Sequence, residues 1–413
     1  MRLEALRQPD LFTRSQVAKA LVSKGVTLGA LNRSEEAVGV YDEVVRRFGD
    51  ATEPQLREQV AKAMLKRGFS LGALNRREAA VGAYDEVVRR FADATELVLR
   101  EQVAKALYNK GVELGVLKRS EDAIGVCDEV VRRFGDATDP VLREMVARAL
   151  FNKGLRLGAL KRSEDAIGVY DEIGRRFGDA TEPVLREMVA KALVNKGVGL
   201  GALKRSEEKI GICDEVVRRF GDATEPVLRE QVAKALYNEG VELGVLKRPE
   251  DAIGIWDEVV RRFGDATDPV LCEMLAKALY NKGLRLGALK RSEDEVGVYD
   301  EVVRRFGDAT EPVLREQVAN ALYNKGVDLG ALKRSEDAIS AYDEVVRRCG
   351  DATEPALREL AAKALVNKGV VLGALKRIED ATGVYNEVVR RFGDATEPAL
   401  REQVAMARAA IKV

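Results

Sequence analysis

An all-α solenoid of antiparallel helix pairs is predicted by a strict internal repeat and by a composition suited to helices. The segment Arg-Arg-Phe-Gly-Asp-Ala-Thr, or a close variant of it, recurs at intervals of 43 residues in nine copies, without insertion or deletion. Aromatic residues make up only 5% of the chain and only 10 residues are Pro, which favours helices throughout. A fixed period of this size indicates stacked units, none of which buries its apolar face alone.

The third copy shows how one repeat encodes two helices. The first helix is expected from about Glu96 to Leu117, with Thr95 as its N-cap. After a tight turn, Ser120 is expected to cap a second helix that ends near Phe134. The Gly after this Phe is expected to adopt the left-handed conformation that ends many helices. The buried face of the first helix is predicted from residues at helical spacing, namely Leu99, Val103, Leu107, Gly111 and Leu114.

One glycine of the first helix, Gly111 in the third copy, is present at the same position in all nine copies. A glycine inside a helix costs about 1 kcal/mol relative to alanine. We therefore expect a neighbouring helix to approach closely at this position, and exposure of the backbone to a ligand is the alternative.

The repeats divide the chain into three segments. Residues 1–12 are an atypical lead-in, residues 13–396 hold nine helix-turn-helix repeats of 43 residues, and residues 397–413 are expected to form a C-terminal capping helix. A lone terminal helix covers the last apolar face of a solenoid.

The segment from Ala106 to Cys127 resembles the tetratricopeptide repeat. That family places a small Gly in its first helix, a large residue three positions later, Ala near the start of its second helix and an aromatic residue four positions further on. Gly111, Leu114 and Ala123 match this pattern, and the position of Cys127 is Tyr or Trp in most other copies. The unit of about 34 residues in that family is extended here. The resemblance spans about residues 13–413 and implies a right-handed superhelical α-solenoid that binds partners in its concave groove.

Composition excludes several classes of function. Lys and Arg number 68, as do Asp and Glu, so no net charge attracts nucleic acid or a membrane surface. No apolar run approaches the roughly 18 residues of a membrane span, and the N-terminus lacks a secretory signal. His is absent and the four Cys occupy scattered repeat positions. We therefore expect a cytoplasmic protein that is not an enzyme and binds no metal and no cofactor.

The candidate binding surface is the face of the first helix opposite its buried stripe. Lys105 and Asn109 lie there one turn apart, with Tyr108 and Glu113 at the edges. Stacked repeats would turn these positions into ladders of ammonium and amide donors for an extended or acidic peptide. The candidate residues are Lys105, Tyr108, Asn109, Glu113, Arg148, Asn152, Arg156, Lys191, Asn195, Lys234, Asn238, Lys277, Asn281, Asn324 and Asn367.

The tetratricopeptide resemblance adds a specific precedent, because some domains of that family grip a C-terminal carboxylate with Lys and Asn at similar positions. Lys105 with Asn109 and Lys234 with Asn238 are the matching pairs. A purely structural role is the alternative, in which Glu101 pairs with Lys105 and the asparagines bridge neighbouring repeats. The column that contains Glu113 and Arg156 changes charge repeatedly between copies. Either it sets ligand specificity or nothing constrains it.

Three functions fit the sequence. The leading hypothesis is a non-catalytic protein-protein interaction scaffold that binds a peptide or helix of a protein partner in its concave groove. The second is the ligand-sensing repeat array of a multidomain bacterial signalling or defence protein. The third is a self-assembling structural repeat protein. Neither the ligand nor the oligomeric state follows from the sequence.

Overall fold

The computed structural model describes residues 10–412, and in this range the chain is built of helices without strands. The helices form two compact units, which divide between Arg205 and Ser206. Unit 1 contains α1 (Leu11–Ala30), α2 (Ser34–Phe48), α3 (Pro54–Ala73), α4 (Arg77–Arg90), α5 (Leu97–Val116), α6 (Ser120–Phe134), α7 (Pro140–Ala159), α8 (Ser163–Phe177) and α9 (Pro183–Ala202). Unit 2 contains α10 (Ser206–Phe220), α11 (Pro226–Val245), α12 (Pro249–Phe263), α13 (Pro269–Ala288), α14 (Ser292–Phe306), α15 (Pro312–Ala331), α16 (Ser335–Cys349), α17 (Pro355–Ala374), α18 (Ile378–Phe392) and α19 (Pro398–Ile411).

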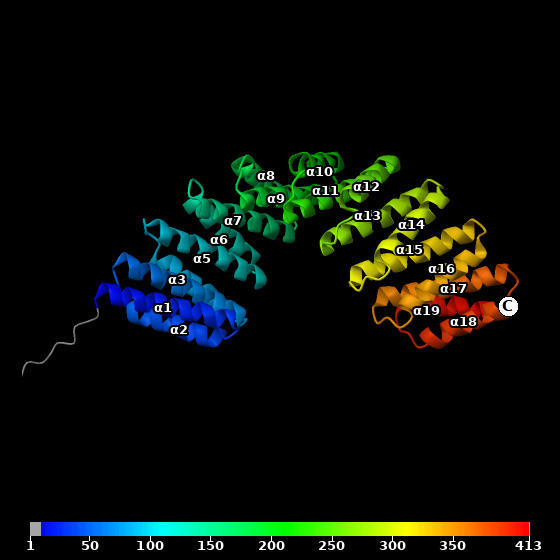
Figure 1. Cartoon of the computed structure of the whole chain (residues 1–413), viewed down its shortest axis with the longest axis horizontal. Coiled ribbons are helices and arrows are strands. Elements are labelled where there is room, and N and C mark those ends of the chain that lie inside the picture. The colour runs from blue at the N-terminus through cyan, green and yellow to red at the C-terminus, as the bar shows by residue number, and fades with distance from the viewer. Residues whose placement is uncertain (1–9, 413) are drawn as a thin grey trace, which may run out of the picture. The chain divides into compact units, whose positions relative to one another are not determined.

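Each repeat is a pair of antiparallel helices, and successive pairs pack side by side within a unit (Figure 1). We call the odd-numbered helices helix A and the even-numbered ones helix B. Within each unit, successive A helices contact one another, whereas the described B helices contact only A helices. The A helices therefore form the more closely spaced, concave layer of each unit. This arrangement confirms the predicted all-α solenoid.

The repeated glycine of helix A lies against the aromatic residue of helix B in the same repeat. A Cβ atom built on Gly154 would overlap the buried ring of Tyr170, and one built on Gly240 would overlap the indole of Trp256. The expectation of close helix approach is therefore confirmed. At Gly111 the partner is the smaller Cys127, and an added Cβ would lie 3.7 Å from its sulfur, at ordinary contact distance.

The starts of the helices differ from the sequence-based expectation. The N-cap of α5 is Glu96 and not Thr95, and Leu97 is its first residue. Ser120 is already inside α6, whose cap position is Arg119 without a side-chain hydrogen bond. Side-chain caps do occur where the cap residue is aspartate: Asp139 Oδ1 accepts from the backbone N–H groups of Val141 and Leu142 at 3.0 Å. Residues 1–9 of the predicted lead-in lie outside the described residues, and α1 begins at Leu11.

The expected left-handed glycine at the end of helix B was wrong. No glycine in the described range has a positive φ, and Gly135 has a φ of −56°. The structure instead requires a glycine there because an added Cβ would lie only 2.5 Å from the carbonyl oxygen of Val131. In the one copy with Ala92 at this position, helix B ends one residue earlier, at Arg90. The left-handed residue lies after helix A, where Lys118 has a φ of 60°.

Of the described helices, none combines the length and the apolar character that crossing a membrane requires.

Candidate functional site

The face of helix A opposite its buried stripe carries a strip with three positions per repeat, and the first two hold candidate residues. In α5 these are Lys105, Asn109 and Val112, which follow one another at helical spacing on one face. The third position holds an apolar residue in every repeat, and we call these residues the apolar column. It consists of Val26, Phe69, Val112, Leu155, Val198, Val241, Leu284, Val327 and Val370. Seven of the nine are exposed, with 37–57% of their surface accessible, although Val112 and Val241 are half-buried.

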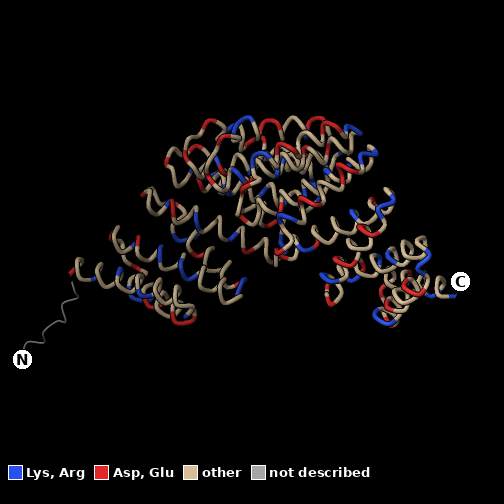
Figure 2. The backbone as a smooth tube through the Cα atoms, turned by 45° about the vertical axis from the view of Figure 1, so that its right-hand side comes forward, with Lys and Arg blue, Asp and Glu red and all other residues tan. Residues whose placement is uncertain are grey.

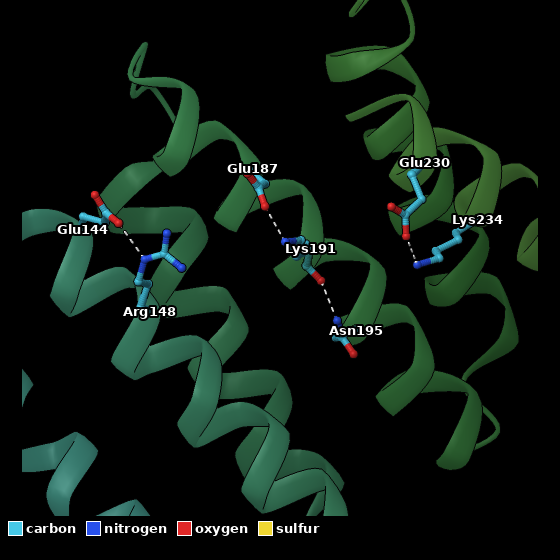
Figure 3. A network of polar contacts seen from close by, with 7 residues as sticks. All are labelled: Glu144, Arg148, Glu187, Lys191, Asn195, Glu230 and Lys234. Atoms are coloured by element: carbon cyan, nitrogen blue, oxygen red, sulfur yellow. Dashed lines mark hydrogen bonds and ion pairs between the residues drawn. The ribbon is translucent and has the colours of Figure 1, made fainter. Parts of the chain in front are cut away.

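The cationic position is charge-balanced by an acid one turn before it. Lys105 Nζ lies 3.1 Å from Glu101 Oε2, and Arg148 Nε lies 2.7 Å from Glu144 Oε1. The same ion pair joins Lys191 to Glu187, Lys234 to Glu230 and Lys277 to Glu273. Figure 3 shows the pairs of Arg148, Lys191 and Lys234. The helix-A cations therefore present paired charges, as the structural alternative for Lys105 expected.

The asparagines use their amide N–H groups inside the protein. In unit 1, Asn109 Nδ2 donates to the carbonyl oxygen of Lys105 at 2.7 Å, and Asn195 donates to that of Lys191 at 2.8 Å (Figure 3). In unit 2 the amides donate to a Tyr hydroxyl of the preceding repeat, at 3.1 to 3.2 Å: Asn281 to Tyr237, Asn324 to Tyr280 and Asn367 to Tyr323. The carboxamide oxygens of these five residues accept no hydrogen bond within the described range.

The aromatic residues beside the strip connect neighbouring repeats. Tyr108 is half-buried, and its hydroxyl interacts with Arg148 of the next repeat. Burial raises the pKa of Tyr280, which keeps its hydroxyl protonated while it accepts from Asn324. These hydroxyls fix the orientation of the Asn and Arg side chains. From the sequence, Tyr108 could either anchor a partner or pack against the next repeat, and its contact with Arg148 fits the second role.

The column that contains Glu113 and Arg156, which varies in charge between copies, lies between repeats and not on the exposed strip. Glu113 is only 9% exposed, and its Oε2 lies 2.7 Å from Nη1 of Arg77 in the preceding repeat. Arg156 is half-buried, with Nη1 3.5 Å from the carbonyl oxygen of Gly115. Glu242 is also buried and bonds to Lys209, with Nζ 2.6 Å from Oε2. The charges of Glu113 and Glu242 therefore face basic residues of the preceding repeat, and Arg156 faces its backbone.

The remaining candidate residues, Asn152 and Asn238, are half-buried on the same strip as Asn109. The apolar column is not among the candidates that the sequence singles out. Its signal is the recurrence of an apolar side chain every 43 residues on the face opposite the buried stripe. Elsewhere, blue and red segments alternate along the backbone of each unit (Figure 2), so no extended field of one sign accompanies the strip.

Comparison with known proteins gives a match to one family model and several solved structures of similar fold. A family model of the tetratricopeptide repeat matches residues 62–94, which cover the end of α3, all of α4 and the start of the following link. No curated protein matches the chain.

Three solved structures share the fold at low sequence identity. An engineered protein gives a TM-score of 0.55 at 18% identity, over 99% of this chain and 97% of its own. The apo form of RapI gives 0.54 at 12% identity, over 86% and 98% of the two chains. A structure from a study of a phosphorylation switch in the interaction between cadherin and β-catenin gives 0.53 at 13% identity, over 97% and 82%.

Proposed function

Because the chain is an array of tetratricopeptide-like repeats, we propose that it is a non-catalytic protein-interaction scaffold. Its partner is a peptide or helix that presents apolar side chains to the exposed strip of the A helices. The observation that carries this proposal is the apolar column, in which an exposed Val, Leu or Phe recurs once in most repeats. Exposed apolar groups that are aligned in this way mark interaction surfaces more often than scattered ones do.

The polar positions of the strip indicate which charges and hydrogen-bonding groups the partner carries. Because the cations are paired with glutamates, the strip selects no strongly acidic ligand, and the acidic peptide expected from the sequence is the less favoured partner. The asparagine oxygens remain available as acceptors, so they can receive N–H groups of a partner backbone. One protein of similar fold comes from work on the interaction between cadherin and β-catenin, which is compatible with a protein partner.

The test is selection from a random peptide-display library on the full chain and on two variants. The first variant combines Val198→Asp, Val327→Asp and Val370→Asp, which are exposed positions of the apolar column. The control is Ile378→Asp, which introduces the same charge at a residue that is 63% exposed on helix B. We expect enrichment of apolar-rich peptides on the natural chain and the control, and loss of that enrichment on the triple variant.

Both variants alter exposed side chains, so their circular dichroism should match that of the natural chain, and each substitution should change the free energy of unfolding by no more than about 0.5 kcal/mol. Peptides that bind the folded triple variant as well as the natural chain would contradict the proposal. Adding Asn195→Ala and Asn281→Ala then measures the contribution of the carboxamide acceptors separately.

A further inference from the structure

One repeat lacks the Phe that lies at or directly after the end of helix B in the others. Eight copies place a Phe at this position, and all eight side chains are buried, with 3–7% of their surface exposed. In the eighth copy the residue is Cys349, the last residue of α16. The thiol is 2% exposed and forms no disulfide. A Cys fills much less volume than a Phe, and α16 spans the same repeat positions as most other B helices.

A cavity of about 110 Å³ lies beside this thiol. Its walls come from the link after α14, from α15, from the end of α16 and from α17, and they include Ala309, Val318, Cys349 and Leu357. Arg315 lies at its edge. In the corresponding site of the third repeat, the guanidinium of Arg100 lies over the ring of Phe134, 5.8 Å from its centroid. The cavity in unit 2 therefore occupies the space that a phenyl ring takes in the other repeats.

The lining of the cavity carries no unpaired charge. Burial raises the pKa of the Cys349 thiol to about 11, so it stays an uncharged S–H group that is a poor nucleophile. The two bordering cations are already paired, Arg315 with Glu354 at 3.0 Å and Arg348 with Glu344 at 2.5 Å. Arg348 also donates to the carbonyl oxygen of Gly307. Neither guanidinium therefore demands an anion in the cavity.

We propose that this cavity is a binding site for a small, neutral, monocyclic aromatic molecule, whose ring lies where the Phe side chain lies in the other repeats. Apolar cavities of roughly 150 Å³ in protein interiors stay dry and take up benzene. The cavity beside Cys349 is of comparable size. Its walls combine aliphatic and thiol side chains with Arg315 and Arg348, and the equivalent of Arg315 in the third repeat, Arg100, lies over a phenyl ring. Its ligand binds without a covalent bond, and the site is separate from the apolar column on the A helices.

The experiment is calorimetric titration of the full chain with toluene, which reproduces the phenyl ring and one methylene carbon of Phe. The natural chain is expected to bind one toluene. Cys349→Phe fills the cavity with the side chain of the other copies, and we expect it to reduce the affinity about tenfold or more, since the same space holds only one ring. Cys349→Ala keeps the cavity and is expected to keep the binding.

The two variants separate the contribution of the cavity from that of the thiol. Cys349→Phe restores the residue of the other repeats, so it is expected to fold, and its unfolding midpoint should not fall. The proposal is overturned if the natural chain binds no toluene, or if Cys349→Phe binds it as tightly as the natural chain. It is also overturned if Cys349→Ala loses binding while folded, because the thiol and not the cavity would then be the site.

Discussion

At the scale of single residues, replacing the repeated glycine of helix A has a different effect on stability in different repeats, because the neighbouring residue of helix B differs. The Cβ of an alanine at position 154 would overlap the buried ring of Tyr170, so either the ring or helix A has to move. At position 111 the nearest atoms are the Cys127 sulfur at 3.7 Å and the Ala123 carbonyl oxygen at 3.8 Å. The glycine at position 111 therefore has a helix-propensity cost without a packing reason.

We expect opposite effects from two identical substitutions. Gly154→Ala should destabilise the chain by about 1–3 kcal/mol through overpacking. Gly111→Ala should stabilise it by up to about 1 kcal/mol, since alanine favours the helix. Urea unfolding followed by circular dichroism measures both, and each variant is the control for the other. Equal destabilisation by both would show that the Tyr170 ring is not the cause.

A second residue-scale contrast concerns charge between repeats. A basic residue of helix A pairs with an aspartate of the preceding helix B in most repeats, as in Lys110 with Asp85 at 2.5 Å and Lys153 with Asp128 at 2.6 Å. In α11 this position is Glu239, which is 5% exposed and faces Asp214. Burial, reinforced by the charge of Asp214 and opposed by Arg248, raises the pKa of Glu239 to about 7. An unfavourable pair thus replaces a favourable one.

This pair predicts a dependence of stability on pH. Because the folded pKa of Glu239 lies above its ordinary value, its contribution to stability is full in acid and is lost as the pH rises through about 7. Glu239→Lys should therefore raise the free energy of unfolding by about 1–3 kcal/mol at about pH 8, and by less at about pH 5. Urea titrations at the two pH values measure this.

A second carboxyl group of unit 2, that of Asp328, also makes the free energy of unfolding depend on pH. Burial, with the adjacent Glu295, raises the pKa of Asp328 to about 7, so this carboxyl acts in the same direction. Asp328→Asn combined with Glu239→Lys should make the free energy of unfolding depend less on pH than Glu239→Lys alone does. A profile for the natural chain that rises between about pH 5 and pH 8 would contradict this prediction, since both shifted groups predict a fall.

At the scale of elements, the turn within each repeat is set by a left-handed residue that is not glycine. Just after α7, the backbone N–H of Lys161 donates to the Gly158 carbonyl oxygen at 2.9 Å, and that of Arg162 donates to the Leu157 carbonyl oxygen at 2.9 Å. This is the bonding pattern of a Schellman motif, with Lys161 at a φ of 60°. The equivalent residue is Asn in the first two repeats and Lys in the other seven. The turn ends helix A and aligns helix B against it.

The turn residue should therefore tolerate asparagine and not a β-branched residue. Lys161→Val should cost about 1–2 kcal/mol, because Cβ branching clashes with the backbone at positive φ. Lys161→Asn reproduces the residue of the first two repeats and should leave the free energy of unfolding unchanged or slightly raised. Thermal unfolding of the two variants measures the difference. If valine is tolerated as well as asparagine, the left-handed conformation at this turn is not required.

The helix pairs and their order could be predicted from the periodicity of the sequence. The exact ends of the helices and the apolar column of the exposed strip became clear only from the structure. The predicted first helix of the third repeat, from about Glu96 to Leu117, differs by one residue at each end from α5. Glycine is the residue that most often takes the left-handed conformation at a helix end, so the sequence predicts this conformation at Gly135. In the structure, Lys118 has the left-handed conformation instead. Conformational preference alone could not predict the conformation of Gly135, because this glycine is present for another reason, the close approach of the Val131 carbonyl oxygen.

The charged residues show the same limit of sequence reasoning. The pairing of Lys105 with Glu101 was foreseeable, since both lie on one helix. The contact of Glu113 with Arg77 was not, because it joins two repeats and depends on how they stack. The second Arg of each Arg-Arg pair has the same helical position in every repeat, and its sequence context gives no sign of a partner in another repeat. In α8, however, Arg176 Nη1 donates to the Gly135 carbonyl of the preceding link at 3.1 Å.

At the scale of the whole molecule, stability within each unit comes from contacts between adjacent repeats. Arg143 of α7 pairs with Glu182 at the start of α9, Lys153 of α7 pairs with Asp128 of α6, and Arg176 of α8 bonds to the link before α7. Each of these interactions joins neighbours in the array. The free energy of such a solenoid is approximately a sum over repeats and their nearest-neighbour interfaces.

Local coupling of this kind predicts that damage to one repeat stays near it. In the full chain, Gly154→Ala should speed hydrogen exchange in α7 and α8 and, to a smaller degree, in the adjoining helices of unit 1. The amides of α14 to α16 in unit 2 should keep their natural exchange rates, because their own cores are unchanged. Exchange measured by mass spectrometry resolves these helices, with Gly111→Ala as the matched control. An equal loss of protection in α8 and α16 would mean that the two units unfold as one cooperative body, and a nearest-neighbour description would then be wrong for this chain.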